Sequence, residues 1–439
     1  MNKGMCAIVG GVLLAALVAP VTPRPADRPY LDAARLAARW IDGATLHTPE
    51  GLAWPADPRD AKTVGKTLYS GTPGVVLFYL ALARSTGERA YLDQARGGAD
   101  WLLASLGKEQ SAGLYEGLSG IGFTLHEVFK ATREQKYDGG ARLVVRRLRD
   151  GATRVGKGVQ WSETTDIISG TAGTGLFLLY AARELKDQSA SDLAIAAGER
   201  LVEIGQPEHG GIKWAMDPKF PRLMPNFSHG TAGIAYFLAT LYRETRRRPF
   251  LDSAVGGARY LQAVAKTDGD SCLIFHSEPD NRDLYYLGWC HGPAGTGRLF
   301  YRLYQATGDR TWLEWAHRSA RALLASGIPE RRTPGFWNNV GVCCGNAGVA
   351  EYMLGLYRAT KQAEYLAFAK RLTANLLGRA TRDEAGMRWI QAEHRVRPEL
   401  LVAQTGYMQG AAGIGVWLLQ LDAAEAGRDL GLHLPDTPF

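Results

Sequence analysis

The sequence predicts an all-α protein, a double-layered α/α toroid (barrel) built from seven helix-pair repeats. A Gly-x-x-Gly unit recurs seven times, and an apolar run follows most of its copies. In five copies a threonine lies fifteen residues after the first glycine, and an aromatic residue follows that threonine by five. Such fixed offsets are typical of a repeated supersecondary unit, which cannot bury its apolar face alone.

Two kinds of landmark set the register of the repeat. The seven glycine pairs are Gly71–Gly74, Gly117–Gly120, Gly170–Gly173, Gly230–Gly233, Gly292–Gly295, Gly345–Gly348 and Gly410–Gly413. The five threonine–aromatic pairs are Thr86–Tyr91, Thr132–Tyr137, Thr245–Phe250, Thr307–Trp312 and Thr360–Tyr365. The third and seventh copies lack the threonine landmark. Successive copies start 46 to 65 residues apart, so each unit contains a loop of variable length.

Each unit is expected to contain an inner helix, a turn at the threonine, an outer helix and the variable loop. The run 75–80 is apolar on all sides, which indicates a buried helix. The segment 365–376 is apolar at helical spacing, which indicates an outer helix with one buried face. Buried inner helices favour a closed ring, because an open solenoid leaves one face in water. The glycines then let seven chain segments converge at one end, where the long loops would form a site.

Composition and charge exclude some classes of function. The 439 residues are 46% hydrophobic and 22% charged, which are ordinary values for a globular protein. The net charge of +7 comes from scattered Lys and Arg, which indicates a solvated basic face or a weak preference for an acidic partner. The sequence has no zinc-finger spacing, no RNA-binding aromatic motif and no long basic tail, so nucleic acid is not an expected partner.

Residues 1–26 are predicted to be a signal peptide or an N-terminal anchor, and residues 27–439 a single toroid domain. Lys3 precedes the mostly apolar run 6–19, and Pro20 follows it. The run is short for a membrane span. Export to the periplasm or the extracellular space is therefore expected. Cleavage of the signal and its retention as a membrane-associated anchor both stay open.

The cysteines and histidines gather beside the glycine pairs. Cys6 lies in the N-terminal segment, and four later cysteines are too few for a disulfide scaffold, which favours a local site. Six residues with ligand or acid–base chemistry lie within four positions of a first glycine: Asp166, His229, Cys290, His291, Cys343 and Cys344. In a ring these side chains converge on one mouth. Three thiolates suit Zn²⁺, with water or a substrate as the fourth ligand.

Other interpretations of these residues stay open. The three cysteines beside the glycines could be small buried hydrophobic residues, or one could form a disulfide with Cys272. Asp166 could cap the helix that follows it. His291 could only orient a neighbouring residue.

With these motifs in view, the chain resembles the lanthionine synthetase C-like (LanC-like) family over about residues 60–420. The resemblance rests on the seven glycine units, on Gly-Trp-Cys-His-Gly at 288–292, on Cys-Cys-Gly at 343–345 and on Ser-His-Gly at 228–230. It implies an α/α toroid with a zinc ion at one end. It also implies zinc-activated addition of a thiol to a dehydroamino acid, which forms (methyl)lanthionine-type thioethers in a peptide. A peptide or a small thiol is the expected substrate.

The resemblance also implies a set of metal ligands. Cys290 and Cys343 match the first two zinc ligands, and Cys344 stands where the common family motif has His. A third thiolate would make the bound substrate thiolate more nucleophilic. The family cyclases carry an Arg four residues before the first ligand, and here that position is Tyr286, a departure that bears on oxyanion stabilisation and so on cyclase activity.

Three further positions match the family's catalytic machinery. His229 matches a site histidine that could act as acid or base toward the thiol or the enolate. Asp166 matches an acidic site residue. His291 stands at a position that is Tyr or His in relatives, and it or His229 would deliver a proton to the α-carbon.

Two other classes of function are compatible with a helical barrel. One is a carbohydrate-active hydrolase that uses two carboxylates, Asp166 with Glu116 or Asp217. The other is a catalytically silent barrel that binds a peptide or a membrane partner. Stoichiometric zinc would favour thiol chemistry over both.

Overall fold

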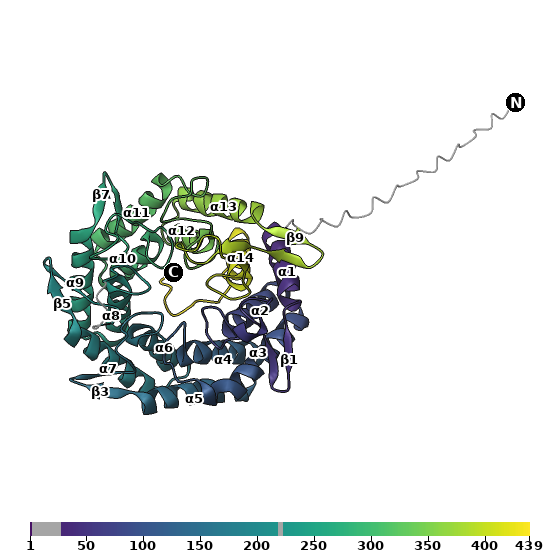
Figure 1. Ribbon diagram of the computed structural model, residues 1–439, viewed down its shortest axis with the longest axis horizontal. Helices are drawn as coiled ribbons and strands as arrows, with labels where there is room; N and C mark the ends of the chain where they lie inside the picture. Colours follow the sequence, from purple (N-terminus) through teal and green to yellow (C-terminus); the bar gives the residue numbers. More distant parts are fainter. Residues whose placement is uncertain (2–27, 218–222) are drawn as a thin grey trace.

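Seven inner helices form a ring, and seven outer helices surround it (Figure 1). This computed structural model describes residues 1, 28–217 and 223–439, and the counts refer to those residues. The inner helices are α2 (Thr72–Thr86), α4 (Leu118–Thr132), α6 (Thr171–Glu184), α8 (Thr231–Thr245), α10 (Pro293–Thr307), α12 (Asn346–Thr360) and α14 (Ala411–Glu425). The outer helices are α3 (Arg89–Ser105), α5 (Gln135–Gly151), α7 (Gln188–Ile204), α9 (Arg248–Val264), α11 (Arg310–Ala325), α13 (Ala363–Gly378) and α1 (Pro29–Asp42). The predicted all-α toroid is confirmed.

The threonine landmark is the turn between the inner and the outer helix. At the end of α2 the Thr86 hydroxyl donates to the Leu82 carbonyl at 2.8 Å and accepts from the Glu88 N–H at 3.1 Å. Gly87 between them is left-handed, with φ +75°. In the third unit Leu185 replaces the threonine, yet Lys186 keeps the left-handed conformation with φ +54°. The turn therefore persists where the sequence signal is lost.

The seventh pair joins the two ends of the described fold. Helix α14 is followed by no outer helix of its own, and α1 packs against it instead. The apolar side of α1, which includes Leu31, Ala34 and Ile41, is buried. Arg28 adds a two-pronged ion pair to Asp422 of α14, at 3.2 and 2.5 Å. The sequence did not predict this partner, because the first helix precedes all seven glycine units.

Short β-hairpins occupy most of the variable loops, a detail that the all-α prediction did not contain. The strands, which pair in sequence order, are β1 (Leu46–Thr48), β2 (Gly51–Ala53), β3 (Thr153–Val155), β4 (Gly158–Gln160), β5 (Gln206–Glu208), β6 (Gly211–Lys213), β7 (Lys266–Asp268), β8 (Ser271–Leu273), β9 (Thr381–Asp383), β10 (Gly386–Arg388), β11 (Ile390–Ala392) and β12 (Leu401–Ala403). Five hairpins follow an outer helix and pack on the next one around the ring, so they join neighbouring units.

A closed circle of backbone hydrogen bonds runs through the loops that precede the inner helices. We call its members, which lie two residues before each first glycine, the belt: Tyr69, Tyr115, Ile168, Ser228, Cys290, Cys343 and Met408. Each belt N–H donates to the belt carbonyl of the next unit at 2.8–3.2 Å, and the Met408 N–H returns to Tyr69. In the third unit the donor is the N–H of the adjacent Ile167. The belt thus sets the relative position of all seven units.

The second glycine of each pair makes room for the loop that carries the belt. A Cβ at Gly413 would lie 1.8 Å from the Tyr407 carbonyl oxygen, and a Cβ at Gly295 would lie 1.8 Å from that of Trp289. Both distances are far inside van der Waals contact. The glycines are therefore required by close backbone approach, as the sequence predicted.

The bore of the ring is filled from both sides. The residues three before each first glycine are buried apolar side chains: Leu68, Leu114, Ile167, Phe227, Trp289, Val342 and Tyr407. From the opposite end, residues 427–439 cross the bore (Figure 1), and the Asp436 carboxylate accepts a hydrogen bond from Trp289 Nε1 at 3.1 Å.

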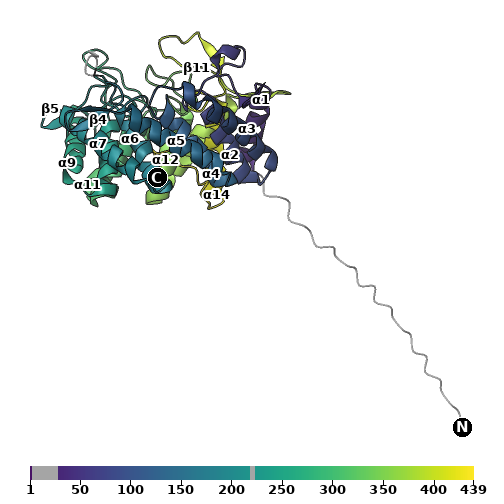
Figure 2. The same cartoon turned by 90° about the horizontal axis from the view of Figure 1, so that it is seen from below.

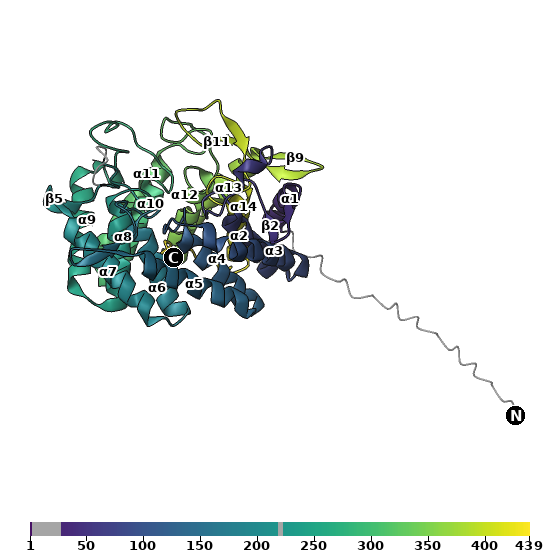
Figure 3. The same ribbon diagram turned by 60° about the horizontal axis from the view of Figure 1, so that its bottom comes forward.

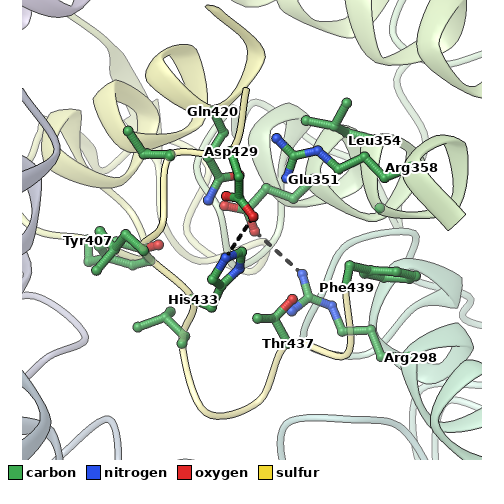
Figure 4. Close-up of a pocket in the computed structure, with 14 residues that line it drawn as sticks. Arg298, Glu351, Leu354, Arg358, Tyr407, Gln420, Asp429, His433, Thr437 and Phe439 are labelled. Carbon is green, nitrogen blue, oxygen red and sulfur yellow. Dashed lines mark hydrogen bonds and ion pairs between the residues drawn. The ribbon is translucent and has the colours of Figure 1, made fainter. Parts of the chain in front are cut away.

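A small cluster of charged residues lies beneath these apolar side chains. Figure 4 shows Arg298 facing Glu351 at 3.4 Å and His433 beside Asp429 at 3.1 Å. Burial raises the pKa of Glu351 to about 7, against the opposing effect of Arg298. Arg298 and Glu351 are therefore charged groups buried within the bore, whereas the cavities of the candidate site are lined by residues of the loops. Figure 2 shows that the long loops gather at one end of the ring.

The predicted N-terminal signal or anchor falls on residues outside the described part, apart from Met1. The boundary between residues 26 and 27 therefore stays a prediction. Among the described helices, none is long and apolar enough to cross a membrane.

Replacing Gly413 by alanine should destabilise the ring. We expect the free energy of unfolding to fall by about 3 kcal/mol, because the new methyl group forces the Tyr407 carbonyl out of the loop. Gly139→Ala is the matched control, since no atom lies within 4 Å of a Cβ there, on the exposed side of α5. That control should gain about 0.5–1 kcal/mol. Chemical denaturation measures both, and equal stabilities of the two variants would contradict the role of close backbone approach.

Candidate metal and catalytic site

The residue directly before each first glycine is polar in all seven units. These residues are Ser70, Glu116, Ser169, His229, His291, Cys344 and Gln409. Because the belt fixes the backbone, equivalent positions of neighbouring units come together at the mouth. Cys290 and Cys343 are adjacent belt members, and the Cys290 N–H donates to the Cys343 carbonyl at 3.1 Å. The repeat thus brings together cysteines that are more than fifty residues apart.

Three cysteine sulfur atoms form a compact buried cluster. Cys344 Sγ lies 3.3 Å from Cys290 Sγ and 3.2 Å from Cys343 Sγ, and all three lie within 4.8 Å of one another. Cys272 takes no part, because its sulfur contacts Ser319 Oγ at 3.7 Å. The four described cysteines are all free, so the structure contains no disulfide between Cys272 and a cysteine of the cluster.

The donor set fits a zinc ion. Zn–S bonds of about 2.3 Å in a tetrahedron place sulfur atoms about 3.8 Å apart. Two of the separations in the cluster are somewhat shorter than this value, and none exceeds 4.8 Å. Hydrogen bonds from Cys290 and Cys344 lower the pKa of Cys343 well below its usual value. Burial raises the pKa of Cys290, and its sulfur and that of Cys343 raise the pKa of Cys344. Without a cation the sulfur atoms therefore oppose one another's ionisation, and a divalent cation would permit all three to ionise.

Two residues that the sequence analysis missed donate hydrogen bonds to the sulfur atoms. Gln409 Nε2 lies 3.8 Å from Cys344 Sγ and 3.0 Å from the Tyr69 hydroxyl. The Tyr69 hydroxyl in turn contacts Cys343 and helps to lower the pKa of that thiol. Such donors stabilise sulfur-centred negative charge and orient metal ligands. Reading the two positions before each glycine across all seven units would have found both residues.

Asp166 both caps a helix and orients His229. Its Oδ1 accepts from the backbone N–H groups of Ser169 and Gly170 at 2.9 and 2.8 Å, which explains the capping interpretation. Its Oδ2 accepts from His229 Nδ1 at 2.6 Å. The carboxylate is buried, while His229 stays 30% exposed at the mouth. Nε2 of His229 is therefore the nitrogen available to a substrate.

The pKa of His229 is raised by its surroundings. Burial lowers it, but the hydrogen bond and charge of Asp166, with smaller contributions from Cys343 and Glu116, outweigh that effect. His229 therefore holds a proton to higher pH than an ordinary histidine, as a general acid near neutrality requires.

His291 lies in a different environment. Burial, His276 and His229 lower its pKa well below the usual value, which favours the neutral imidazole. Its ring centre lies 5.5 Å from that of His229 and 4.5 Å from that of His276. Its Nδ1 is buried, and no described atom hydrogen-bonds to it. His276 could not be predicted from the sequence, because it lies in a variable loop outside the register of the repeat.

Tyr286, at which the resemblance implied a departure from the family pattern, contacts an arginine from another segment. Arg395, in the loop between β11 and β12, donates from Nε to the Tyr286 hydroxyl at 3.2 Å. Burial raises the pKa of Tyr286 to about 12, so this hydroxyl keeps its proton. A guanidinium group therefore lies beside Tyr286, but it comes from Arg395. No feature of the sequence predicted that Arg395 would contact Tyr286.

Two adjoining cavities surround the cysteine cluster. Their volumes are about 520 and 270 Å³, and the segment 393–404 contributes to the walls of both. They share Cys290, Cys343 and His229, so the predicted ligands and the predicted acid–base residue face one space. Of the carboxylates considered for sugar hydrolysis, Glu116 lines the larger cavity, whereas Asp166 and Asp217 line neither.

The fold and the site together define an α/α toroid with a thiol-rich cluster and an oriented histidine at its mouth. A family model for lanthionine synthetase C-like proteins matches residues 62–429. The chain belongs to that family, which confirms the resemblance seen in the sequence.

Several solved structures share the toroid at low sequence identity. A nisin cyclase superposes with a TM-score of 0.60 and 15% identity, covering 90% of this chain and 94% of its own. An α-1,6-mannanase of Salegentibacter sp. HEL1_6 gives 0.51 and 16%, covering 90% and 99%. An unsaturated glucuronyl hydrolase specific for heparin gives 0.51 and 12%, covering 92% and 99%. At these identities the likeness concerns the fold alone.

Replacing Asp166 by asparagine should lower the pKa of His229. The asparagine oxygen can still cap Ser169 and Gly170, but the charge that opposes burial is lost, so the pKa should fall below that of an ordinary histidine. NMR titration of the histidine ring protons measures the shift. Glu116→Gln is the control and should give a smaller decrease, since Glu116 is the weakest of the contributors. An unchanged pKa in Asp166→Asn would show that the carboxylate does not set the protonation of His229.

Proposed function

We propose that this protein is a zinc-dependent LanC-like enzyme. It activates a thiol for addition to a dehydroamino acid and so forms (methyl)lanthionine-type thioethers in a peptide. The observation that carries the proposal is the cluster of three cysteine sulfur atoms beside an Asp166-oriented His229, in a chain of this family. A peptide substrate accords with the name of the nisin cyclase that shares the fold.

Cys290, Cys343 and Cys344 would hold the zinc ion. When bound there, zinc would lower the pKa of a substrate thiol and so supply thiolate near neutral pH. Gln409 and Tyr69 donate hydrogen bonds toward the cluster and would hold its sulfur atoms in place.

His229 would transfer the protons, first from the substrate thiol and then to the α-carbon. Its Nδ1 donates to Asp166, so Nε2 can take the thiol proton and later return one. The substrate thiolate attacks the β-carbon of dehydroalanine or dehydrobutyrine, a C–S bond forms, and the C=C electron pair moves to an enolate. Nε2–H then protonates the α-carbon, which restores the peptide carbonyl. His291, whose pKa is lowered, would remain neutral during this cycle.

The carbohydrate-hydrolase alternative receives less support from the site. Both Asp166 oxygens are engaged, by two backbone N–H groups and by His229, and Asp166 lines neither of the two cavities at the cysteine cluster. A pair of carboxylates working across a glycosidic bond needs both groups to reach the sugar. The alternative also gives no role to the three cysteines.

Metal content and activity test the proposal together. Wild-type protein should carry about one zinc ion per chain and add the cysteine of a dehydrated peptide across its dehydroalanine. Cys343→Ala should lose both properties. His229→Gln should keep the zinc and lose about 100-fold or more in rate.

The matched control for the metal measurement is Cys272→Ala. That cysteine is also buried and free but lies outside the cluster, so this variant should keep the zinc and the activity. Absence of zinc from reduced, zinc-replete wild-type protein would overturn the thioether mechanism.

We also propose that the enzyme is exported, because the apolar run 6–19 follows a basic residue and precedes a proline. N-terminal sequencing of the protein from fractionated cells would identify both the compartment and any cleavage. Recovery of the complete chain from the cytoplasm would overturn this part of the proposal.

A further inference from the structure

One hairpin carries nearly all of the exposed large apolar side chains in the described part of the chain. Ile390, Val396, Leu400 and Leu401 are 47, 71, 51 and 44% exposed. Apart from Met1, the one other such residue is Leu143 on α5, at 36%. Exposed apolar residues on soluble proteins are usually scattered singly, and a concentration of them marks an interaction site. We call residues 390–403 the roof hairpin.

Part of the roof hairpin also belongs to the walls of the candidate site. Val402 lines the larger cavity, Arg395 and Val396 line the smaller one, and Glu393 and His394 line both. The same short segment thus contributes to the walls around the cysteine cluster and displays apolar side chains outside it. A molecule bound on the hairpin would continue directly into the cavity.

The base of the roof hairpin is held firmly over the mouth. The Ala392 carbonyl accepts from Trp337 Nε1, and the Ala392 N–H donates to the Asn338 carbonyl, both at 2.9 Å. Arg395 adds its hydrogen bond to Tyr286. Figures 2 and 3 show the hairpin, labelled β11, rising from the end of the ring where the long loops gather. Its apolar side chains are therefore presented on a fixed support.

Three kinds of partner could cover the exposed side chains of the roof hairpin: a bilayer, a second copy of the chain or a substrate peptide. The position of the hairpin favours the peptide. A bilayer or a second copy of the chain lying on this surface would cover the mouth and hinder access to the cysteines. A substrate peptide would cover the hairpin and enter the cavity at the same time. The hairpin also alternates charge with apolar residues, with Glu393, Arg397 and Glu399 beside the exposed side chains. An interface with an apolar centre and a polar rim suits a peptide.

We propose that the roof hairpin is a docking surface for an apolar stretch of the substrate peptide, adjacent to the reacting residues. The identity of the occupant as the substrate rests on the proposed function. The apolar contacts would hold the peptide while its cysteine and dehydroamino acid enter the cavity. Recognition would therefore depend on leucine, isoleucine or valine near the reacting positions, and a small thiol would not need the hairpin.

A binding experiment without chemistry tests the docking surface. The probe is a short fluorescent peptide that carries cysteine and alanine, in place of cysteine and dehydroalanine, flanked by leucine, isoleucine and valine. Fluorescence anisotropy gives its Kd for full-length protein. Val396→Asp and Leu400→Asp should each weaken binding by about tenfold or more, as expected for a central contact of an interface.

Leu143→Asp is the matched control, because it places the same charge at the other exposed apolar residue, away from the hairpin. This variant should bind the probe as wild type does. A probe with serine in place of its apolar residues should bind wild type as weakly as the hairpin variants bind the original. Equal affinity of wild type and both hairpin variants for the apolar probe would overturn the inference.

Further measurements separate this inference from the proposed function. Zinc content, and the rate of adding a small thiol to a dehydroalanine amide, should be unchanged in Leu400→Asp, because Leu400 lines neither cavity. That result also shows that this variant folds. If wild type lacks zinc and activity yet the variants still lose peptide binding, the proposed function fails and the docking surface stands.

The alternative occupants have their own readouts. Sedimentation of wild-type protein with phosphatidylcholine–phosphatidylglycerol vesicles, abolished by Leu400→Asp, would assign the hairpin to a membrane and overturn the inference. A wild-type dimer in analytical ultracentrifugation that Leu400→Asp dissociates would assign it to a second copy, with the same consequence. A protein that is monomeric, does not sediment with vesicles and binds the peptide supports the inference.

Discussion

The belt of seven backbone hydrogen bonds is the constraint on which the rest of the structure depends. Each unit donates one backbone N–H to the belt carbonyl of the neighbouring unit, from Ile167 in the third unit and from the belt residue in the others. No loop can therefore shift without breaking two of these bonds. The loops approach the inner helices so closely that a side chain at Gly295 or Gly413 would overlap a carbonyl oxygen. The belt and the glycines therefore require each other. Together they fix where the side chains just before each glycine lie: apolar ones in the bore and polar ones at the mouth.

This constraint also explains how a crowded thiol cluster can exist. Three sulfur atoms within 4.8 Å disfavour ionisation of more than one, and a flexible loop would separate them. Here Cys290 and Cys343 are neighbours in the belt, and Cys344 follows in the same loop, so the backbone holds them together before any ion binds. A preorganised donor set loses little conformational freedom on binding a metal. The same rigidity keeps His229 against Asp166 at 2.6 Å.

The sequence could predict those features of the structure that recur in every repeat of the chain. The glycine pairs and the threonine turns reflect local requirements, namely close approach and a left-handed residue such as Gly87, and these leave marks at fixed offsets. The three cysteines and His229 could be placed because they share that register. Helix α1 could not be matched to α14, because their contact joins opposite ends of the described chain. His276 and Arg395 come from variable loops, where only tertiary contacts bring them to the site.

The toroid itself does not select the chemistry. An α-1,6-mannanase shares the fold over 90% of this chain at 16% identity, so the same ring also occurs in a protein that is named for another activity. The chemistry of a given toroid therefore depends on the residues that follow the belt and on the loops around the mouth. In this chain neighbouring units present thiols and imidazoles, whereas Ser70, Glu116 and Ser169 stand at the equivalent positions of the first three units. Reactive groups are thus confined to one arc of the mouth, and the roof hairpin stands beside that arc, where a bound peptide would meet the cysteines first.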